Sequence, residues 1–294
     1  MAKKRKKGKK GKGKKSKPIP DYVRDRHLLY EAAVQSPEAD LEFFDKVFRS
    51  RHGRGFTRFR EDFCGTAALS TTYVKQSGTH HALGVDLDRP TLDWGTKHYQ
   101  STLKPEQRDR IDLRCADVRD VESPKSELTC ALNFSYGVFK TRDELRKYFE
   151  SARRGLQPGG LFVVDAFGGT EAMDEMDEDR DVAESTSVGG HEMPEFVYVW
   201  EQARFNIVDH HMTCHIHFEL EDGTRIENAF TYEWRVWTLP ELIELMHEAG
   251  FEDAGAYLEG WDEDEDDGDG EFERRTELDN QEGWVGYVVA FKSK

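Results

Sequence analysis

Acidic and amide side chains recur at the ends of predicted strands in the first half of the chain. The stretch "REDFCGTAALS" (residues 60–70) places Glu61 and Asp62 directly before a turn at Gly65 that opens a helix. Three further polar residues end the next three predicted strands: Asp86, Asp117 and Asn133. A helix N-terminus attracts anions, whereas neighbouring carboxylates repel them. The pattern therefore favours a ligand that carries charges of both signs.

A dinucleotide is a poor match for this turn. Its pyrophosphate would be repelled by the two carboxylates, and of the three glycines that such a turn uses only Gly65 is present. S-adenosylmethionine carries no phosphate, and its amine and sulfonium are cationic while its carboxylate can meet the helix N-terminus. Asp86, 21 residues after Gly65, can accept the ribose hydroxyls, and Asp117 can accept the adenine amino group. The predicted cofactor-binding residues are Glu61, Cys64, Gly65, Asp86, Asp117 and Asn133.

Alternating strands and helices predict an α/β fold with a doubly wound, Rossmann-like, seven-stranded sheet whose final strand is antiparallel. The first five strands are expected at residues 56–63, 81–87, 110–118, 128–136 and 159–167, and the closing strands at 252–260 and 284–291. The first strand carries more charge than a central parallel strand usually does. After strand five, period-two alternation over 196–205, 211–220 and 225–237 predicts an antiparallel β insertion of about 170–237. The acidic runs 171–184 and 262–271 are expected to be solvated loops.

Several of these motifs together resemble the class I S-adenosylmethionine-dependent methyltransferases. "EDFCGTA" is similar to their first motif, "GVDLD" to the acidic motif of strand two, "ADV" to the adenine contact, and "LQPGGLFVVDAFGG" to the turn and fifth strand. "NFSYGVFKTR" and "FTYEWRVWTLPEL" resemble a bacterial subgroup of unknown substrate. The resemblance implies a methyltransferase domain over 19–294. Phe63 and Ala67 depart from it, because the family usually has glycine at both positions.

Methyl transfer is an in-line displacement, so alignment and exclusion of water can supply much of the catalysis. We expect Asn133 to hold the acceptor and Tyr136 to line its pocket. His215 is a candidate base if the acceptor must lose a proton. Tyr30 and Arg235 are candidate substrate contacts, although Arg235 could equally form an ion pair with an acidic neighbour. His211, His215 and His217 share one face of a strand, but a complete ligand set cannot be identified, so no metal is predicted.

The charge of the chain is unevenly distributed. The net charge is −16, yet the first 17 residues carry 11 Lys and Arg and no acid, which leaves 31 basic against 58 acidic residues, or −27, for the remainder. Residues 1–18 are therefore expected to be a disordered basic tail, which either makes weak contact with nucleic acid or only aids solubility. The four cysteines form no C-x-x-C pair, and no apolar run is long enough to span a membrane, which favours the cytoplasm.

The sequence predicts an S-adenosylmethionine-dependent methyltransferase of a small or medium-sized acceptor, with an amine as the candidate group. One alternative acceptor is RNA or a ribosomal protein, guided by the basic tail. A second alternative is a protein that binds the cofactor without turnover. The oligomeric state is left open.

Overall fold

The computed structural model describes residues 19–262 and 267–294. The predicted basic tail lies outside the described residues, as do residues 263–266 of the second acidic run.

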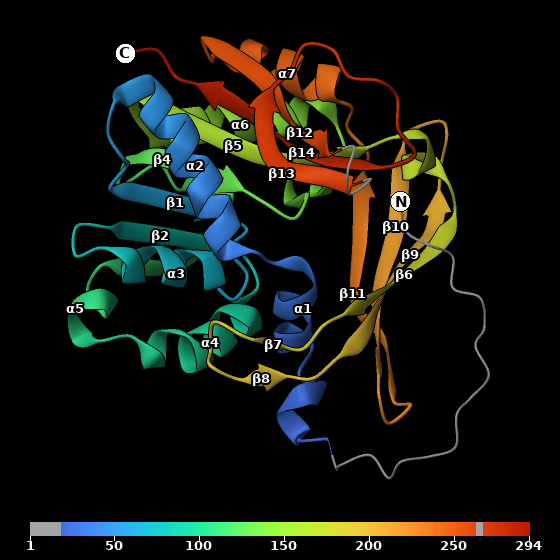
Figure 1. The fold of residues 1–294 in the computed structure, drawn as a ribbon. Helices are drawn as coiled ribbons and strands as arrows, with labels where there is room; N and C mark the ends of the chain where they lie inside the picture. The colour runs from blue at the N-terminus through green and yellow to red at the C-terminus, as the bar shows by residue number, and fades with distance from the viewer. Residues whose placement is uncertain (1–18, 263–266) are drawn as a thin grey trace.

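A central eight-stranded sheet has the order β13-β12-β14-β5-β4-β1-β2-β3 (Figure 1). Its strands are β1 (Arg58–Asp62), β2 (His81–Asp86), β3 (Ile111–Cys115), β4 (Ser126–Ala131), β5 (Leu156–Gly168), β12 (Asp253–Asp262), β13 (Asp267–Arg274) and β14 (Trp284–Phe291). β1 to β5 run parallel, and β14 pairs antiparallel with β5 and β12. The predicted doubly wound fold is confirmed. The sheet has one more strand than predicted, because residues 267–271 of the second acidic run belong to β13 instead of a loop.

Helices cover both faces of this sheet. The α-helices are α1 (Arg26–Val34), α2 (Pro37–His52), α3 (Ala68–Gln76), α4 (Arg89–His98), α5 (Pro105–Arg108), α6 (Arg142–Gly155) and α7 (Leu239–Glu248). The 3₁₀ turns are η1 (Asp21–Arg24), η2 (Gln100–Thr102), η3 (Val118–Asp120), η4 (Ser135–Val138) and η5 (Thr170–Met173). One apolar cluster joins α2 and α3 to the sheet, and another joins α6 and α7 to its opposite face.

The charged residues of β1 are accommodated by pairing inside the core. The Arg60 side chain is fully buried, and its Nε donates to Asp62 Oδ1 at 2.6 Å. Arg60 also donates to the carbonyl oxygens of Val118 and Val121, while the Tyr148 hydroxyl donates to Asp62. A buried ion pair is tolerated when its remaining donors and acceptors are also satisfied. The strand can therefore occupy the centre of the sheet despite its charge.

The segment after β5 forms a separate antiparallel sheet of order β11-β10-β9-β6. Its strands are β6 (Met176–Val182), β9 (Phe196–Phe205), β10 (His211–Leu220) and β11 (Arg225–Arg235), and a small hairpin of β7 (Ser185–Thr186) and β8 (Glu192–Met193) lies between β6 and β9 in the chain. This insertion sheet stands beside the central sheet, and α1 packs between them (Figure 1). β6 lies in the acidic run that was expected to be a loop, so that expectation is wrong. An edge strand can carry acidic side chains because they remain in water.

Candidate functional site

The turn after β1 keeps a glycine-type backbone although two of its positions carry side chains. Phe63, Gly65 and Ala67 have φ of 57°, 52° and 58°. Residues with a Cβ rarely adopt this left-handed region. The Phe63 ring compensates by packing against Phe139 and Tyr148, at centroid distances of 6.0 and 5.6 Å. The turn therefore adopts a left-handed backbone at Phe63 and Ala67 although both residues carry side chains.

The N-terminus of α3 is open beside this turn. Ala67 occupies the N-cap position and makes no capping hydrogen bond through its own side chain, and among the first N–H groups that of Ser70 is taken by Glu61. The first N–H groups of a helix have no partner within it, and together they attract a carboxylate. The turn therefore presents donors at the carboxyl end of β1.

Asp86 connects this turn to the end of β2. Its Oδ2 accepts a hydrogen bond from the Gly65 N–H at 2.7 Å, and its Oδ1 accepts one from the Asp88 N–H at 2.8 Å. Burial raises the pKa of the Asp86 carboxyl above its usual value. Each oxygen can accept a second hydrogen bond, so Asp86 can hold its loop and still accept a ligand hydroxyl.

Glu61 lies beneath the same turn and is almost fully buried. Its Oε2 accepts hydrogen bonds from the N–H of Ser70 at 3.0 Å and from the Ser70 hydroxyl at 2.5 Å. Burial raises the pKa of Glu61 to about 8, and the nearby carboxyl groups of Asp40 and Asp86 act in the same direction. Without a cation beside it, Glu61 is therefore mostly protonated at neutral pH.

Asp165, on β5, organises the turn that follows β4. Its two carboxyl oxygens accept hydrogen bonds from the backbone N–H groups of Asn133 at 2.6 Å and Phe134 at 2.9 Å. Both of these residues have positive φ, so the carboxyl group stabilises an unusual backbone. Burial raises the pKa of Asp165 to about 8. The sequence-based site residues did not include Asp165; an acid inside the apolar strand "GGLFVVDAF" was the signal that could have revealed it.

Asp40 of α2 completes a group that we call the buried acid cluster: Asp40, Glu61 and Asp165. The Tyr287 hydroxyl donates to Asp40 at 2.7 Å, and burial raises the pKa of Asp40 to about 6. The charge of Asp40 raises the pKa of both Glu61 and Asp165. The cluster lies on the face of the sheet that α2 and α3 cover, below the carboxyl ends of β1 and β5.

Two other predicted cofactor residues are engaged by the protein itself. Asp117 accepts hydrogen bonds from the side chain of Arg119 at 2.6 and 3.0 Å, and this pair lowers the pKa of Asp117. The Cys64 side chain is buried and packs against Gly84 in the core. The turn therefore offers its backbone and Gly65 to a ligand, whereas the Cys64 thiol faces inward.

The inner face of the insertion sheet supplies aromatic side chains beside the turn after β4. The rings of Tyr232 and Trp234 stack with centroids 4.3 Å apart, and Trp234 meets Phe134 at 6.2 Å. Phe134 in turn packs on Phe167 at the end of β5, at 4.7 Å. We call these rings, with the neighbouring Trp200, the aromatic wall: Phe134, Phe167, Trp200, Tyr232 and Trp234. All except Trp234 are partly exposed, so the wall can contact a ligand.

Tyr30 and Tyr136 both lie near the buried Asp165. Tyr30, from α1, packs on Phe230 at 4.9 Å, and its pKa is raised by burial, by Tyr232 and by the charge of Asp165. Tyr136 is buried in η4, where burial and Asp165 raise its pKa. It lines a small pocket together with Phe134 and Trp234. Tyr30 and Tyr136 therefore lie within electrostatic range of the Asp165 carboxyl, and the Asn133 N–H donates to it.

A family model described as a methyltransferase domain matches residues 63–160. Over these residues the chain is similar to a methyltransferase domain. The match includes the turn after β1, the ends of β2, β3 and β4, and the turn that Asp165 organises. The resemblance to class I methyltransferases is confirmed. No curated protein matched the sequence.

Solved structures, methyltransferases among them, share this fold along most of the chain. DesVI of Streptomyces venezuelae has a TM-score of 0.64 and 16% identity, over 94% of this chain and 100% of that one. CalS10, an amino pentose methyltransferase from Micromonospora echinaspora, has a TM-score of 0.63 and 17% identity, over 96% and 100%. The sugar N-methyltransferase KedS8 from Streptoalloteichus has a TM-score of 0.62 and 16% identity, over 98% and 100%. At identities this low the likeness concerns the fold.

The fold does not bring His215 to this site. His215 pairs across the insertion sheet with Thr231, and its Nδ1 lies 2.9 Å from the Thr231 hydroxyl on the exposed face. Its neighbour Cys214 points the other way and packs with Trp234. His217 lies on the outer face with His215, between Glu201 and the Asn228 N–H. Strand alternation predicted that the histidines share a face, but that face is turned away from the acid cluster.

Arg235 has a partner within the protein. Its Nη2 donates to Glu241 of α7 at 3.0 Å, and its guanidinium lies 3.8 Å from the centre of the Trp237 ring. Of the two roles expected for Arg235, the structure shows the ion pair. Its side chain also lines the small pocket beside Tyr136.

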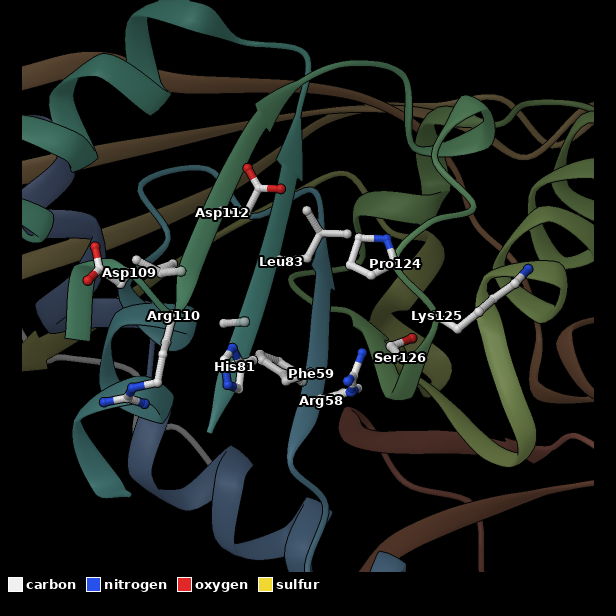
Figure 2. A pocket seen from close by; sticks show the side chains of 12 residues that line it. Arg58, Phe59, His81, Leu83, Asp109, Arg110, Asp112, Pro124, Lys125 and Ser126 are labelled. Carbon is white, nitrogen blue, oxygen red and sulfur yellow. The ribbon is translucent and has the colours of Figure 1, made fainter. Parts of the chain in front are cut away.

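A pocket of about 210 Å³ lies at the opposite edge of the central sheet, at the amino ends of β1 to β3 (Figure 2). Arg58, Leu83 and Pro124 are among its lining residues. The Arg110 guanidinium is occupied by the carbonyl oxygens of Val74, Ser77 and His80. Ligands of open parallel sheets bind at the carboxyl ends of the strands, so we do not assign the methyltransferase site to this pocket.

The part of the chain that the structure describes contains no group of three or more His, Cys, Asp or Glu side chains that could hold a metal ion. Within the same residues, no helix is long and apolar enough to cross a membrane.

Proposed function

We propose that this protein transfers a methyl group from S-adenosylmethionine to the amine of a small acceptor. The observation that carries the proposal is the buried acid cluster beneath an open helix N-terminus. Glu61 and Asp165 both have a pKa of about 8 in the absence of a cation, because no opposite charge compensates their burial. A ligand with cationic groups would supply that charge.

The residues present fit this cofactor. The N-terminus of α3 would meet its carboxylate, and Glu61 its ammonium group. Asp86 has acceptor capacity left for the ribose hydroxyls, and Asp117 would accept from the adenine amino group beside Arg119. When bound, the cofactor supplies an electrophilic methyl group on a sulfonium.

The acceptor would lie between the turn after β4 and the aromatic wall. Asn133 and Tyr136 would position it, and Tyr30 would contact it from α1. The partly exposed rings of Trp200 and Tyr232 would exclude water from the acceptor nitrogen. Aromatic faces also attract cationic groups, which suits an amine that gains methyl groups.

Two features support an amine over RNA or a ribosomal protein. The chain beyond the first 17 residues carries −27, and nucleic-acid enzymes usually place basic residues around the site. In addition, two proteins with this fold are an amino pentose methyltransferase and a sugar N-methyltransferase.

Calorimetry with S-adenosylmethionine and its demethylated product tests the cofactor assignment. Transfer of labelled methyl groups to a panel of amino sugars, other small amines and total RNA tests the acceptor. We expect binding of both nucleosides and labelling of an amine, with turnover unaffected by a chelator or by deletion of residues 1–18. RNA labelling that depends on those residues would contradict the acceptor class. Binding without labelling of any acceptor would favour a non-catalytic binding protein.

A further inference from the structure

The connection between β3 and β4 leaves part of the central sheet without a covering helix. It spans residues 116–125, and within it the short turn η3 is the one helical segment. Parallel sheets are normally covered on both faces, because each crossover usually contains a helix. α3 packs on one face of β1 and β2. On the other face, the amino ends of β1, β2 and β3 are bordered by the loop before β4 instead of a helix.

The pocket of about 210 Å³ at these strand ends lies on that second face (Figure 2). Its lining residue Leu83 belongs to the same apolar cluster as Val118 and Val121 of the connection. Pro124, from the loop before β4, lies beside Leu83 (Figure 2). The pocket therefore has an apolar part formed by these two side chains. Drug-sized ligands usually occupy about 300–1,000 Å³, so this pocket suits a smaller molecule.

Arg58 and His81 place two basic side chains at the β1 and β2 side of this pocket. They are partners in the parallel register of the two strands, so their Cα atoms lie about 5 Å apart. Residues two apart on a strand share a face, which puts His81 with Leu83, and Arg58 with Arg60, which donates to the connection. Both side chains are exposed, and neither has a hydrogen-bond or ion-pair partner among residues 19–262 and 267–294.

Two further cations line the pocket, but their donors are already used. The Arg110 guanidinium is held by three carbonyl oxygens, and Lys125 Nζ donates to the carbonyl oxygen of Arg154. With Arg58, the lining carries three permanent cations against two acids. The chain beyond its first 17 residues carries −27, so this pocket is an exception on an acidic protein. The excess of positive charge favours an anionic ligand.

The two acids of the lining lie away from Arg58 and His81. Asp112 is on β3 and pairs with Arg114 at 2.7 Å. Asp109 precedes β3 in the chain. Because β2 separates β1 from β3 in the sheet, both acids are about 10 Å from Arg58 across the strands. The Arg58 side of the pocket can therefore accept an anion without direct repulsion.

We propose that this pocket binds a small organic acid, with its carboxylate between Arg58 and His81 and its apolar body over Leu83. A guanidinium presents a fork of donors that matches a carboxylate, and a neutral imidazole offers one more N–H. Inorganic phosphate would meet the same donors but would leave the apolar part of the pocket uncovered. The site goes beyond the proposed function, because it lies at the opposite ends of the strands and none of its residues takes part in methyl transfer.

Amide NMR spectra of the full-length protein, titrated with benzoate, salicylate and succinate, test the site. We expect at least one acid to shift the signals of His81 and Leu83. Benzamide, the neutral counterpart of benzoate, should bind at least about tenfold more weakly than benzoate, because it lacks charge-assisted hydrogen bonds to Arg58. Inorganic phosphate should also bind more weakly than the best acid, because it covers no apolar surface.

Substitutions at Arg58 separate its charge from its shape. Arg58→Ala should weaken binding of the best acid about tenfold or more, and Arg58→Lys, which keeps the charge but loses the fork, should fall between. The Arg58 backbone N–H still donates to Glu127 in both variants, and thermal unfolding checks that they are folded. Arg225→Ala, which removes an arginine from the insertion sheet, is the control and should leave the affinity unchanged.

Three results would overturn the inference. One is the absence of shifts at His81 and Leu83 with all three acids at millimolar concentration, including the case in which only signals of residues 1–18 move. The others are equal binding of benzoate and benzamide, and undiminished affinity in Arg58→Ala. None of these results bears on the proposed function, which binding of S-adenosylmethionine tests separately.

Discussion

Asp86 and Gly65 are joined by a hydrogen bond of 2.7 Å from the Gly65 N–H to the carboxylate at the end of β2. The proposed ribose contact therefore also holds the turn after β1 in place. Asp86→Ala should weaken binding of S-adenosylmethionine roughly 10- to 100-fold, since each hydrogen bond to a charged group contributes about 1.5–3 kcal/mol. Calorimetry measures the dissociation constants of S-adenosylmethionine from the wild type and the variant.

Asp86→Asn provides the matched comparison for that prediction. Asparagine keeps one carbonyl acceptor for Gly65 but loses the charge and one acceptor oxygen. Its effect on cofactor affinity should fall between those of wild type and Asp86→Ala. Equal affinity in all three proteins would contradict the role assigned to Asp86.

The stability of the ligand-free protein should fall as pH rises from 6.5 to 8. Glu61 and Asp165 have raised pKa values of about 8, so the folded state holds more protons than the unfolded state in this window. Stability decreases with pH wherever the folded state binds more protons, by at most about 1.4 kcal/mol per pH unit for each group. Above pH 8 both carboxyl groups are ionised in the folded state as well. The free energy of unfolding should then stop falling with pH.

Urea unfolding at half-unit pH intervals measures this dependence. Four histidines with pKa values lowered by burial act in the opposite direction, but only as pH falls through 6.5: His27, His52, His80 and His98. Glu61→Gln should reduce the slope between pH 6.5 and 8. An unchanged slope would show that Glu61 ionises normally.

Arg235 is expected to stabilise the junction between β11 and α7. Arg235→Ala removes the hydrogen-bonded pair with Glu241 and the contact with Trp237, so the free energy of unfolding should fall by about 1–3 kcal/mol. Cofactor affinity should stay within about twofold of wild type, because Arg235 lies outside the cofactor residues. Urea unfolding and calorimetry measure the two quantities.

Arg225, on the same strand, is the control for that substitution. It pairs with Glu219 and Glu227 on an exposed surface, where ion pairs contribute roughly 0–1 kcal/mol. Arg225→Ala should therefore have a smaller effect than Arg235→Ala. A larger loss at Arg225 would contradict the structural role proposed for Arg235.

The strand-end residues of the site were predictable from sequence. Asp86 ends β2, while Asp117 and Asn133 lie just after β3 and β4, and parallel strands bring their carboxyl ends to one edge of a sheet. The capping boxes of α6 and α7, at Thr141 with Glu144 and at Thr238 with Glu241, also follow from a local spacing of three residues. These features depend on a few neighbouring residues or on a general rule of sheet topology.

Only the tertiary structure decided which distant side chains meet. Asp165 was one acid in an apolar strand until the fold placed it under Asn133 and beside Tyr30 and Asp40. The alternation of β10 predicted that His215 and His217 share a face, but the packing of the insertion sheet determined that this face is turned away from the acid cluster and that His217 is buried there beside Glu201 and Asn228. Periodicity shows which side chains share each face of a strand. The burial and charge of a side chain depend instead on what packs against its face, and residues far apart in the chain determine that packing.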